Sequence, residues 1–183
     1  MLINKLLGTS HARVYRFLTR NIDKSFMESE IVSAVGVRRS AVNLAVRDLA
    51  QHGLINREIR GRTSFYSTDP TDPIARQFKI WETTLRLQYV LEKLRPLVRK
   101  VVLFGSAAEG QDTARSDIDL FIIGQDRNSV RAITGDFNED QRIQAVIVSE
   151  QDLAVIKSED PAFYSQIQRG LILFESTIGE TES

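Results

Sequence analysis

The sequence has 183 residues, no cysteine, and 24 basic side chains against 24 acidic ones. The absence of cysteine excludes a disulfide scaffold, a cysteine-ligated zinc site and thiol catalysis. No apolar run reaches the roughly 18 residues of a transmembrane helix, and the first residues lack the apolar core of a signal peptide. We therefore expect a cytoplasmic protein with no membrane segment.

The zero net charge is the average of two unlike halves. Residues 1–69 contain eleven Lys and Arg against six Asp and Glu, a net charge of +5, whereas residues 70–183 have a net charge of −5. The segment from Asp69 to Pro73 holds two of the four prolines and cannot lie inside a helix. We predict two modules with different partners. The predicted divisions are a domain over 1–69, a linker and connecting helix over 70–96, a second domain over 97–176 and a disordered tail over 177–183.

The basic half is predicted to form three helices followed by a hairpin. Apolar spacing indicates a first helix over 10–22, capped by Thr9 or Ser10. A second helix opens at Ser25, where Glu28 has capping-box spacing, and a third runs from Arg39 to His52 and stops at Gly53. Residues 54–59 and 63–67 alternate like two strands joined by the turn 60–62.

This order of elements resembles the winged helix-turn-helix family of DNA-binding domains. The resemblance rests on Glu30-Ile31, Gly36-Val37, the third helix and the turn Arg60-Gly61-Arg62. It implies that the third helix enters the major groove and the hairpin contacts the DNA backbone. The implied contacts are Arg39, Ser40, Asn43 and Arg47 on the helix and Arg57, Arg60 and Arg62 on the hairpin. The alternative is a domain of the same shape that binds protein, with these arginines merely solvated.

The connector is predicted to contain one long helix. Asp72 is a good N-cap, Pro73 suits the first helical position, and the helix should run to about Arg95, before Pro96. Two offset apolar stripes are Ile74, Phe78, Trp81 and Leu85, then Leu87, Val90, Leu91 and Leu94. We expect each stripe to pack on one module. The first stripe could equally be the seam of a homodimer, which palindromic DNA sites favour.

The acidic half carries a pattern suited to a hard cation. A predicted strand over 97–104 is followed by Gly105-Ser106, ten further residues, and then Asp117-Ile118-Asp119 at the start of a second strand. Asp117 and Asp119 are alternate residues, so their carboxylates project from the same face. Two carboxylates on one face repel each other unless a cation lies between them, and Mg²⁺ prefers such oxygen ligands.

The same pattern resembles the nucleotidyltransferase superfamily that includes DNA polymerase β, over about residues 90–175. The resemblance implies that Gly105 and Ser106, with Ser116, bind a nucleoside triphosphate such as ATP. It implies that Asp117 and Asp119 are catalytic and bind Mg²⁺. The whole chain is therefore predicted to be an α+β protein: a winged helix-turn-helix, a connecting helix and a nucleotidyltransferase α/β fold with a mixed sheet. Its remaining predicted elements are a strand over 142–148, helices over 150–157 and 161–169, and a strand over 170–174.

Two departures from the superfamily pattern bear on activity. Active members usually supply a third carboxylate from a later strand, and the expected place here holds Gln144 or Ala145. Glu139 and Asp140 lie just upstream and would need another register to reach a metal. The loop after Ser106, where an arginine often faces the phosphates, contains Glu109 instead.

These observations favour a prokaryotic transcriptional regulator that binds double-stranded DNA as a homodimer. Its nucleotidyltransferase-like domain would bind nucleotide and Mg²⁺ with weak or no turnover. One alternative is an active enzyme that transfers a nucleotide from an NTP to a protein or small molecule. A third is an antitoxin-like protein whose acidic half covers a basic protein partner.

Overall fold

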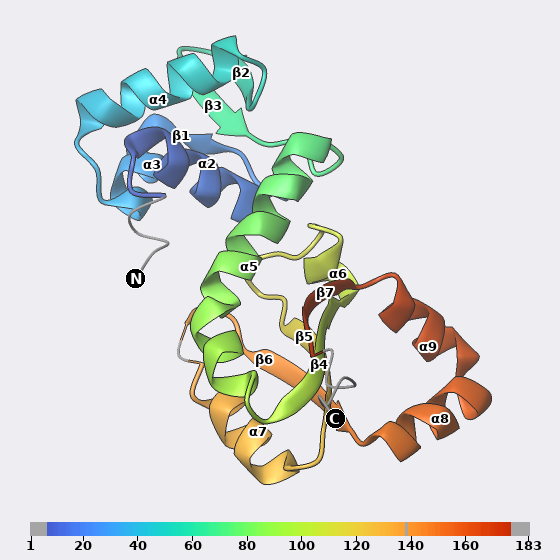
Figure 1. Cartoon of the computed structure of the whole chain (residues 1–183). Helices are drawn as coiled ribbons and strands as arrows, with labels where there is room; N and C mark the ends of the chain where they lie inside the picture. Colours follow the sequence, from blue (N-terminus) through green and yellow to red (C-terminus); the bar gives the residue numbers. More distant parts are fainter. Residues whose placement is uncertain (1–6, 138, 177–183) are drawn as a thin grey trace. The chain divides into compact units, whose positions relative to one another are not determined.

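The computed structural model describes residues 7–137 and 139–176, and the predicted tail over 177–183 lies outside them. The chain divides into two compact units, residues 1–85 and residues 86–183, called here the first and second units. The division falls inside the long helix α5 (Pro73–Leu94), drawn in green in Figure 1. Within the described ranges, none of the helices has the length and apolar character needed to cross a membrane.

The first unit contains the three predicted helices and the predicted hairpin. Its elements are α2 (Ser10–Arg20), β1 (Phe26–Met27), α3 (Glu28–Val35), α4 (Arg39–Gln51), β2 (Asn56–Arg60) and β3 (Thr63–Ser67). The short strand β1 has no counterpart among the sequence predictions. It pairs with β3, so that the sheet has the order β1-β3-β2 and is antiparallel throughout.

Local capping interactions set the helix boundaries of the first unit. The Thr9 hydroxyl accepts a hydrogen bond from the Ala12 N–H, as predicted. The predicted capping box at Ser25 and Glu28 is wrong. The box lies two residues later, where the Glu30 carboxylate accepts from the Met27 N–H, because residues 26 and 27 are extended and pair with β3.

The first unit has an apolar core from all three of its short helices. Val14 and Leu18 of α2, Ile31 of α3, and Val42 and Val46 of α4 are almost completely buried. The start of α5 adds Ala75 and Phe78, and the Phe78 ring lies edge-on to Tyr15 with centroids 4.8 Å apart. These positions follow the predicted apolar spacing of α2 and α4.

Only part of the first apolar stripe predicted on α5 is buried in the core of the first unit. Phe78 packs on the core, but Ile74 and Trp81 are 56% and 43% exposed. A polar side chain is buried here instead. Glu82, 1% exposed, lies 2.7 Å from Nε of Arg16 and 3.4 Å from Nε of Arg20. A buried carboxylate is stable with such cationic partners, so this face of α5 need not be apolar.

The second unit is built on a four-stranded mixed sheet. Its elements after α5 are β4 (Val98–Phe104), α6 (Gly105–Ala108), β5 (Ile118–Gly124), α7 (Arg127–Gly135), β6 (Ile143–Val148), α8 (Glu150–Glu159), α9 (Pro161–Gln168) and β7 (Leu171–Glu175). The strand order is β6-β5-β4-β7, with β5 and β6 parallel and the other pairs antiparallel. The predicted mixed sheet is confirmed, and α7 is an element that the sequence predictions lack.

Helices cover both faces of this sheet (Figure 1). Leu87, Val90, Leu91 and Leu94, the second predicted stripe of α5, are buried against one face together with Val130 of α7. The other face packs on α8 and α9 through Leu153, Ile156, Phe163 and Ile167. Because side chains alternate along a strand, each residue of β5 belongs to one of these two layers.

Candidate functional site

The link between β4 and α6 brings Gly105 against Asp119. Gly105 has a φ of +68°, a left-handed conformation that L side chains rarely adopt. A β-carbon on this residue would lie 2.6 Å from Oδ2 of Asp119, closer than two such atoms can approach. The left-handed backbone favours glycine here, any β-carbon would displace the Asp119 carboxylate, and the Gly-Ser turn and the Asp-x-Asp segment are in direct contact.

Strand pairing fixes the position of Asp119 in the sheet. It is opposite Phe104 of β4 on one side and Gln144 of β6 on the other. Partial burial raises the pKa of the Asp119 carboxyl, and the nearby negative charge of Asp117 raises it further. A carboxylate that is partly buried beside a second negative charge is suited to a cation that would offset both charges.

Asp119 belongs to the sheet face that α9 covers. Phe121 and Ile123, two and four residues further along β5, pack in the layer formed by α8 and α9. The Phe163 ring of α9 contacts Phe104 and Phe121, with centroid distances of 5.8 and 6.2 Å. A ligand at the aspartates would therefore lie on the side of the sheet that carries α9.

The place of a third carboxylate is occupied by an amide. Gln144 is the β6 residue paired with Asp119, and it is exposed. The Glu139 carboxylate is already paired, because it accepts a short hydrogen bond from Nε of Arg86. Across residues 7–137 and 139–176, no three His, Cys, Asp or Glu side chains are grouped so as to hold a metal ion. The described carboxylates at this site are therefore Asp117 and Asp119.

A buried polar network holds the loop in front of these aspartates. Arg86 has a fully buried side chain and donates from Nη1 to Oε1 of Gln141, at 2.5 Å. Nε2 of Gln141 in turn donates to the backbone oxygens of Thr113 and Ser116, both at 3.0 Å, and to Oδ2 of Asp112, at 3.2 Å. The sequence contains no signal for Arg86 and Gln141. Gln141 bonds to backbone oxygens of a loop, and such contacts follow no characteristic residue spacing in the sequence.

The comparisons with known proteins bear on the second unit. A family profile described as polymerase beta, nucleotidyltransferase, matches residues 86–178, which is just over half of the chain. This chain belongs to the polymerase beta nucleotidyltransferase family. The match starts at the residue where the second unit begins. The nucleotidyltransferase part of the predicted fold is confirmed.

Two further comparisons are less informative. A search of curated protein sequences finds no significant match. Among solved structures, a Sulfolobus solfataricus protein assigned as a nucleotidyltransferase is 14% identical, with a TM-score of 0.36 over 58% of this chain and 88% of that one.

The candidate site offers carboxylate oxygens as ligands for a hard divalent cation, but only from a few side chains. Mg²⁺ is commonly bound by one or two carboxylates together with water and substrate phosphates. Asp117 and Asp119 fit that arrangement, and the absence of a side chain at Gly105 leaves space for the Asp119 carboxylate. The metal, when bound, would offset charge on a phosphate, and the two aspartates would hold it.

The other predicted nucleotide-binding residues lie close by. Ser106 is in the first turn of α6, directly after Gly105. The hydroxyl of Ser116 accepts a hydrogen bond from the Thr113 N–H at 2.9 Å, so this side chain stabilises the turn over residues 113–116. We infer that Ser116 acts on the site by ordering the turn before Asp117.

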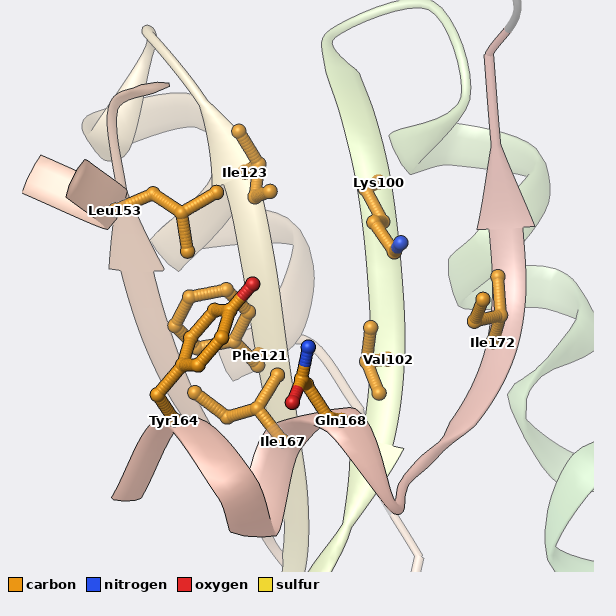
Figure 2. Close-up of a pocket in the computed structure, with 9 residues that line it drawn as sticks. All are labelled: Lys100, Val102, Phe121, Ile123, Leu153, Tyr164, Ile167, Gln168 and Ile172. Atoms are coloured by element: carbon orange, nitrogen blue, oxygen red, sulfur yellow. The ribbon is translucent and has the colours of Figure 1, made fainter. Parts of the chain in front are cut away.

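Two of the cavities formed by the described residues border α9. The first, about 260 Å³, is mostly apolar, and Figure 2 shows Tyr164, Ile167 and Gln168 of α9 over Val102 and Phe121. The second, about 300 Å³, lies beside Gly105 and includes Arg169 just after α9. Arg169 was not among the predicted site residues, because it lies 64 positions from Gly105 and only the pairing of β7 with β4 brings the two together.

The first unit places the predicted DNA contacts on α4 and the hairpin. Arg39, Ser40, Asn43 and Arg47 are exposed on α4, and Arg57, Arg60 and Arg62 are exposed on the hairpin. Several of these side chains form hydrogen bonds within the first unit. Glu28 accepts from Nε of Arg39 at 3.3 Å and from Nδ2 of Asn43 at 2.9 Å. Arg60 donates to Glu58 at 2.7 Å, and Arg57 donates to the Ser64 hydroxyl at 3.0 Å.

Proposed function

We propose that this chain is a DNA-binding regulator whose nucleotidyltransferase-family domain binds a nucleotide with Mg²⁺ and transfers it weakly or not at all. The observation that carries the DNA-binding part is the row of exposed polar and cationic side chains on α4. Arg39, Asn43 and Arg47 follow each other at helical spacing and are exposed, on the flank of α4 next to buried Val42 and Val46. Arginine and asparagine are side chains that read base edges.

The hairpin supports the same proposal. Arg57, Arg60 and Arg62 are exposed on β2 and its turn, and Gly61 has a φ of +64° that makes the turn tight. Cations at such a tip are placed to contact phosphates. The pairing of Arg39 and Asn43 with Glu28 is compatible with binding, because it is exposed and can exchange for contacts to DNA.

The experiment is fluorescence anisotropy of the full chain with a mixed-sequence 30-base-pair duplex at several salt concentrations. We expect binding that weakens with salt, because each phosphate contact releases counterions. Arg47→Ala and Arg62→Ala should each weaken binding about fivefold and lower the salt slope by about one. The matched control is Arg131→Ala, which removes an exposed charge from α7. No binding at low salt, or equal weakening by the control, would refute DNA binding at this surface.

A weak or absent transfer activity is supported by Gln144. An amide occupies the position paired with Asp119, and Glu139 is bound to Arg86. Loss of a carboxylate that binds metal or acts as base costs orders of magnitude in rate, about 10²–10⁴-fold for base assistance alone. Binding of a nucleotide would require less than transfer, since two aspartates and the substrate phosphates can hold one Mg²⁺.

The second candidate function is an active nucleotidyltransferase, favoured by the direct contact between Gly105 and Asp119. Incubation with α-labelled ATP and Mg²⁺, with lysate protein as acceptor, distinguishes the two. We expect the parent to give label at or only slightly above the background of Asp117→Asn and Asp119→Asn. Strong label with the parent that is lost in both variants would establish the active enzyme instead.

The homodimer belongs to the same proposal. Ile74 and Trp81 are exposed apolar side chains of α5, and their exposure supports a seam along this helix. Light scattering of the purified chain should give a mass twice that of the 20.7 kDa monomer. Trp81→Glu should give the monomer mass, and a dimer in that variant would place the seam elsewhere.

A further inference from the structure

The second cavity combines the Gly-Ser turn with the end of α9. Its volume is about 300 Å³. Its lining residues come from two segments, Gly105, Ala108 and Glu109 on one side and Ala162, Ser165, Gln166, Arg169 and Gly170 on the other. The second segment supplies a guanidinium, a hydroxyl and an amide, which are all hydrogen-bond donors. A polar cavity beside a phosphate-binding turn suggests an anionic ligand.

Strand pairing explains why Arg169 lies beside Gly105. β7 pairs antiparallel with β4, and the last pair at this end is Leu103 with Leu171. Two residues beyond this pair, the strands lead to Gly105 on one side and Arg169 on the other. A β-carbon on Gly170 would lie 2.6 Å from the Leu103 backbone oxygen, so the chain passes tightly against β4 at this point. The position of Arg169 is thus fixed by the sheet.

The cavity and the aspartates are on the same side of the sheet. α9 packs through Phe163 on Phe104 and Phe121, and Phe121 shares its strand face with Asp119. Figure 2 shows Tyr164 and Ile167, from the same helix, over this face. A ligand that touches Asp119 and Gly105 could therefore extend toward Arg169 without crossing the sheet.

The charge of the site favours a cation at this position. A nucleoside triphosphate is strongly anionic, whereas Asp117, Asp119 and Glu109 make this end of the sheet acidic. Within residues 7–137 and 139–176, Arg169 forms no ion pair of its own. Its planar guanidinium can donate two parallel hydrogen bonds to phosphate oxygens.

We propose that Arg169, with the Ser165 hydroxyl and the Gln166 amide, binds the terminal phosphates of a nucleoside triphosphate held at Gly105 and the two aspartates. Arg169 thus supplies the positive charge that the α6 loop lacks, where Glu109 stands. We expect the site to favour triphosphates over monophosphates, because only the former carry the terminal phosphates that Arg169 would bind. This inference rests on the proposed nucleotide binding of the second unit.

The test is isothermal titration of the full chain with two probes in Mg²⁺, α,β-methylene-ATP and AMP. Arg169→Ala should weaken binding of α,β-methylene-ATP about tenfold or more, the range expected for a charge-assisted contact. It should change AMP binding less than twofold. Arg169→Lys should recover part of the loss, and Arg131→Ala should bind both probes like the parent. Thermal unfolding checks that the variants remain folded.

The outcomes separate this inference from the function it depends on. If the parent and Arg169→Ala bind α,β-methylene-ATP equally while Asp119→Asn loses binding, the nucleotide site stands and the role of Arg169 is wrong. If Arg169→Ala weakens both probes alike, the proposed contact with the terminal phosphates is also wrong. A parent chain that binds neither probe at millimolar concentration would overturn the nucleotide-binding function, and this inference with it.

Discussion

Gly105 and Asp119 are so close that a side chain added at Gly105 would displace the Asp119 carboxylate. A β-carbon on Gly105 would lie 2.6 Å from Oδ2 of Asp119, so the end of β4 and the start of β5 meet at this point. The left-handed φ of Gly105 turns the backbone into α6 at the same point. The site is therefore built from the backbone of one strand end and the carboxylate of the next.

Gly105→Ala should destabilise the second unit and abolish nucleotide binding. A left-handed alanine costs about 1–2 kcal/mol by itself, and the clash with Asp119 adds to that. Urea unfolding of the full chain measures the loss. The control is Gly135→Ala at the end of α7, where a β-carbon meets nothing within 4 Å and φ is not positive, so helix propensity should make it neutral or stabilising. Equal stability of the two variants would contradict the close approach.

Gln144→Asp should strengthen the response to Mg²⁺. It places a third carboxylate at the position paired with Asp119, so the variant should unfold at a lower temperature than the parent without metal, because like charges repel. With millimolar Mg²⁺ its melting temperature should rise more than that of the parent. Gln144→Asn keeps the amide and should behave like the parent. An identical Mg²⁺ response in all three proteins would show that residue 144 does not face the aspartates.

Gln141→Met should loosen the loop before Asp117. The change leaves the backbone oxygens of Thr113 and Ser116 without the donor that they now share, and it removes an acceptor from buried Arg86. Unsatisfied buried polar groups of this kind should lower the free energy of unfolding by about 2–4 kcal/mol. Amide hydrogen exchange should accelerate at residues 113–118. Gln125→Met, at an exposed position, is the control, and similar exchange in both variants would count against the network.

Glu28→Gln should strengthen DNA binding. Glu28 now accepts hydrogen bonds from Arg39 and Asn43, and its negative charge lies beside the proposed DNA surface. Removing that charge frees Nε of Arg39 and lowers repulsion of phosphates, so anisotropy with the mixed-sequence duplex should show about threefold tighter binding at low salt. Glu92→Gln, an exposed change on α5, should have no such effect. Unchanged binding in Glu28→Gln would mean that α4 does not face DNA.

The first unit should lose stability at high pH through Tyr15. Burial, with a smaller effect of Asp72, raises the pKa of Tyr15 to about 12 from an ordinary value near 10. The folded state thus keeps this proton where the unfolded state releases it. The stabilisation is complete below pH 10 and is lost as the pH rises toward 12.

Tyr15→Phe provides the comparison for this pH effect. The Tyr15 hydroxyl is buried without a hydrogen-bond partner among the described residues, so its removal should stabilise the protein by up to about 1 kcal/mol at pH 7. Urea unfolding between pH 9 and 12 should then fall less steeply in the variant than in the parent. Parallel curves would mean that Tyr15 titrates normally.

Most of the secondary structure could be read from the sequence, because it depends on local signals. Asp72 and Pro73 start α5, Gly53 ends the turn after α4, and the apolar runs around Gly105 and Asp119 give β4 and β5. The elements that were missed or misplaced depend on distant partners. β1 exists only because Phe26 and Met27 pair with β3, and Glu82 of α5 is buried only because it meets two arginines of α2.

The sequence by itself determined the chemistry of the candidate site, since Gly-Ser followed at a fixed distance by Asp-x-Asp specifies a turn and two neighbouring carboxylates, Asp117 just before β5 and Asp119 within it. Only the tertiary structure decided what surrounds them. The parallel pairing of β5 with β6 put Gln144 opposite Asp119, and the antiparallel pairing of β4 with β7 put Arg169 beside Gly105. The spacing of residues within a motif predicts contacts within one strand and the turn next to it. The register between strands is set by the packing of the whole sheet, so neighbours that come from distant segments are found only in the folded chain.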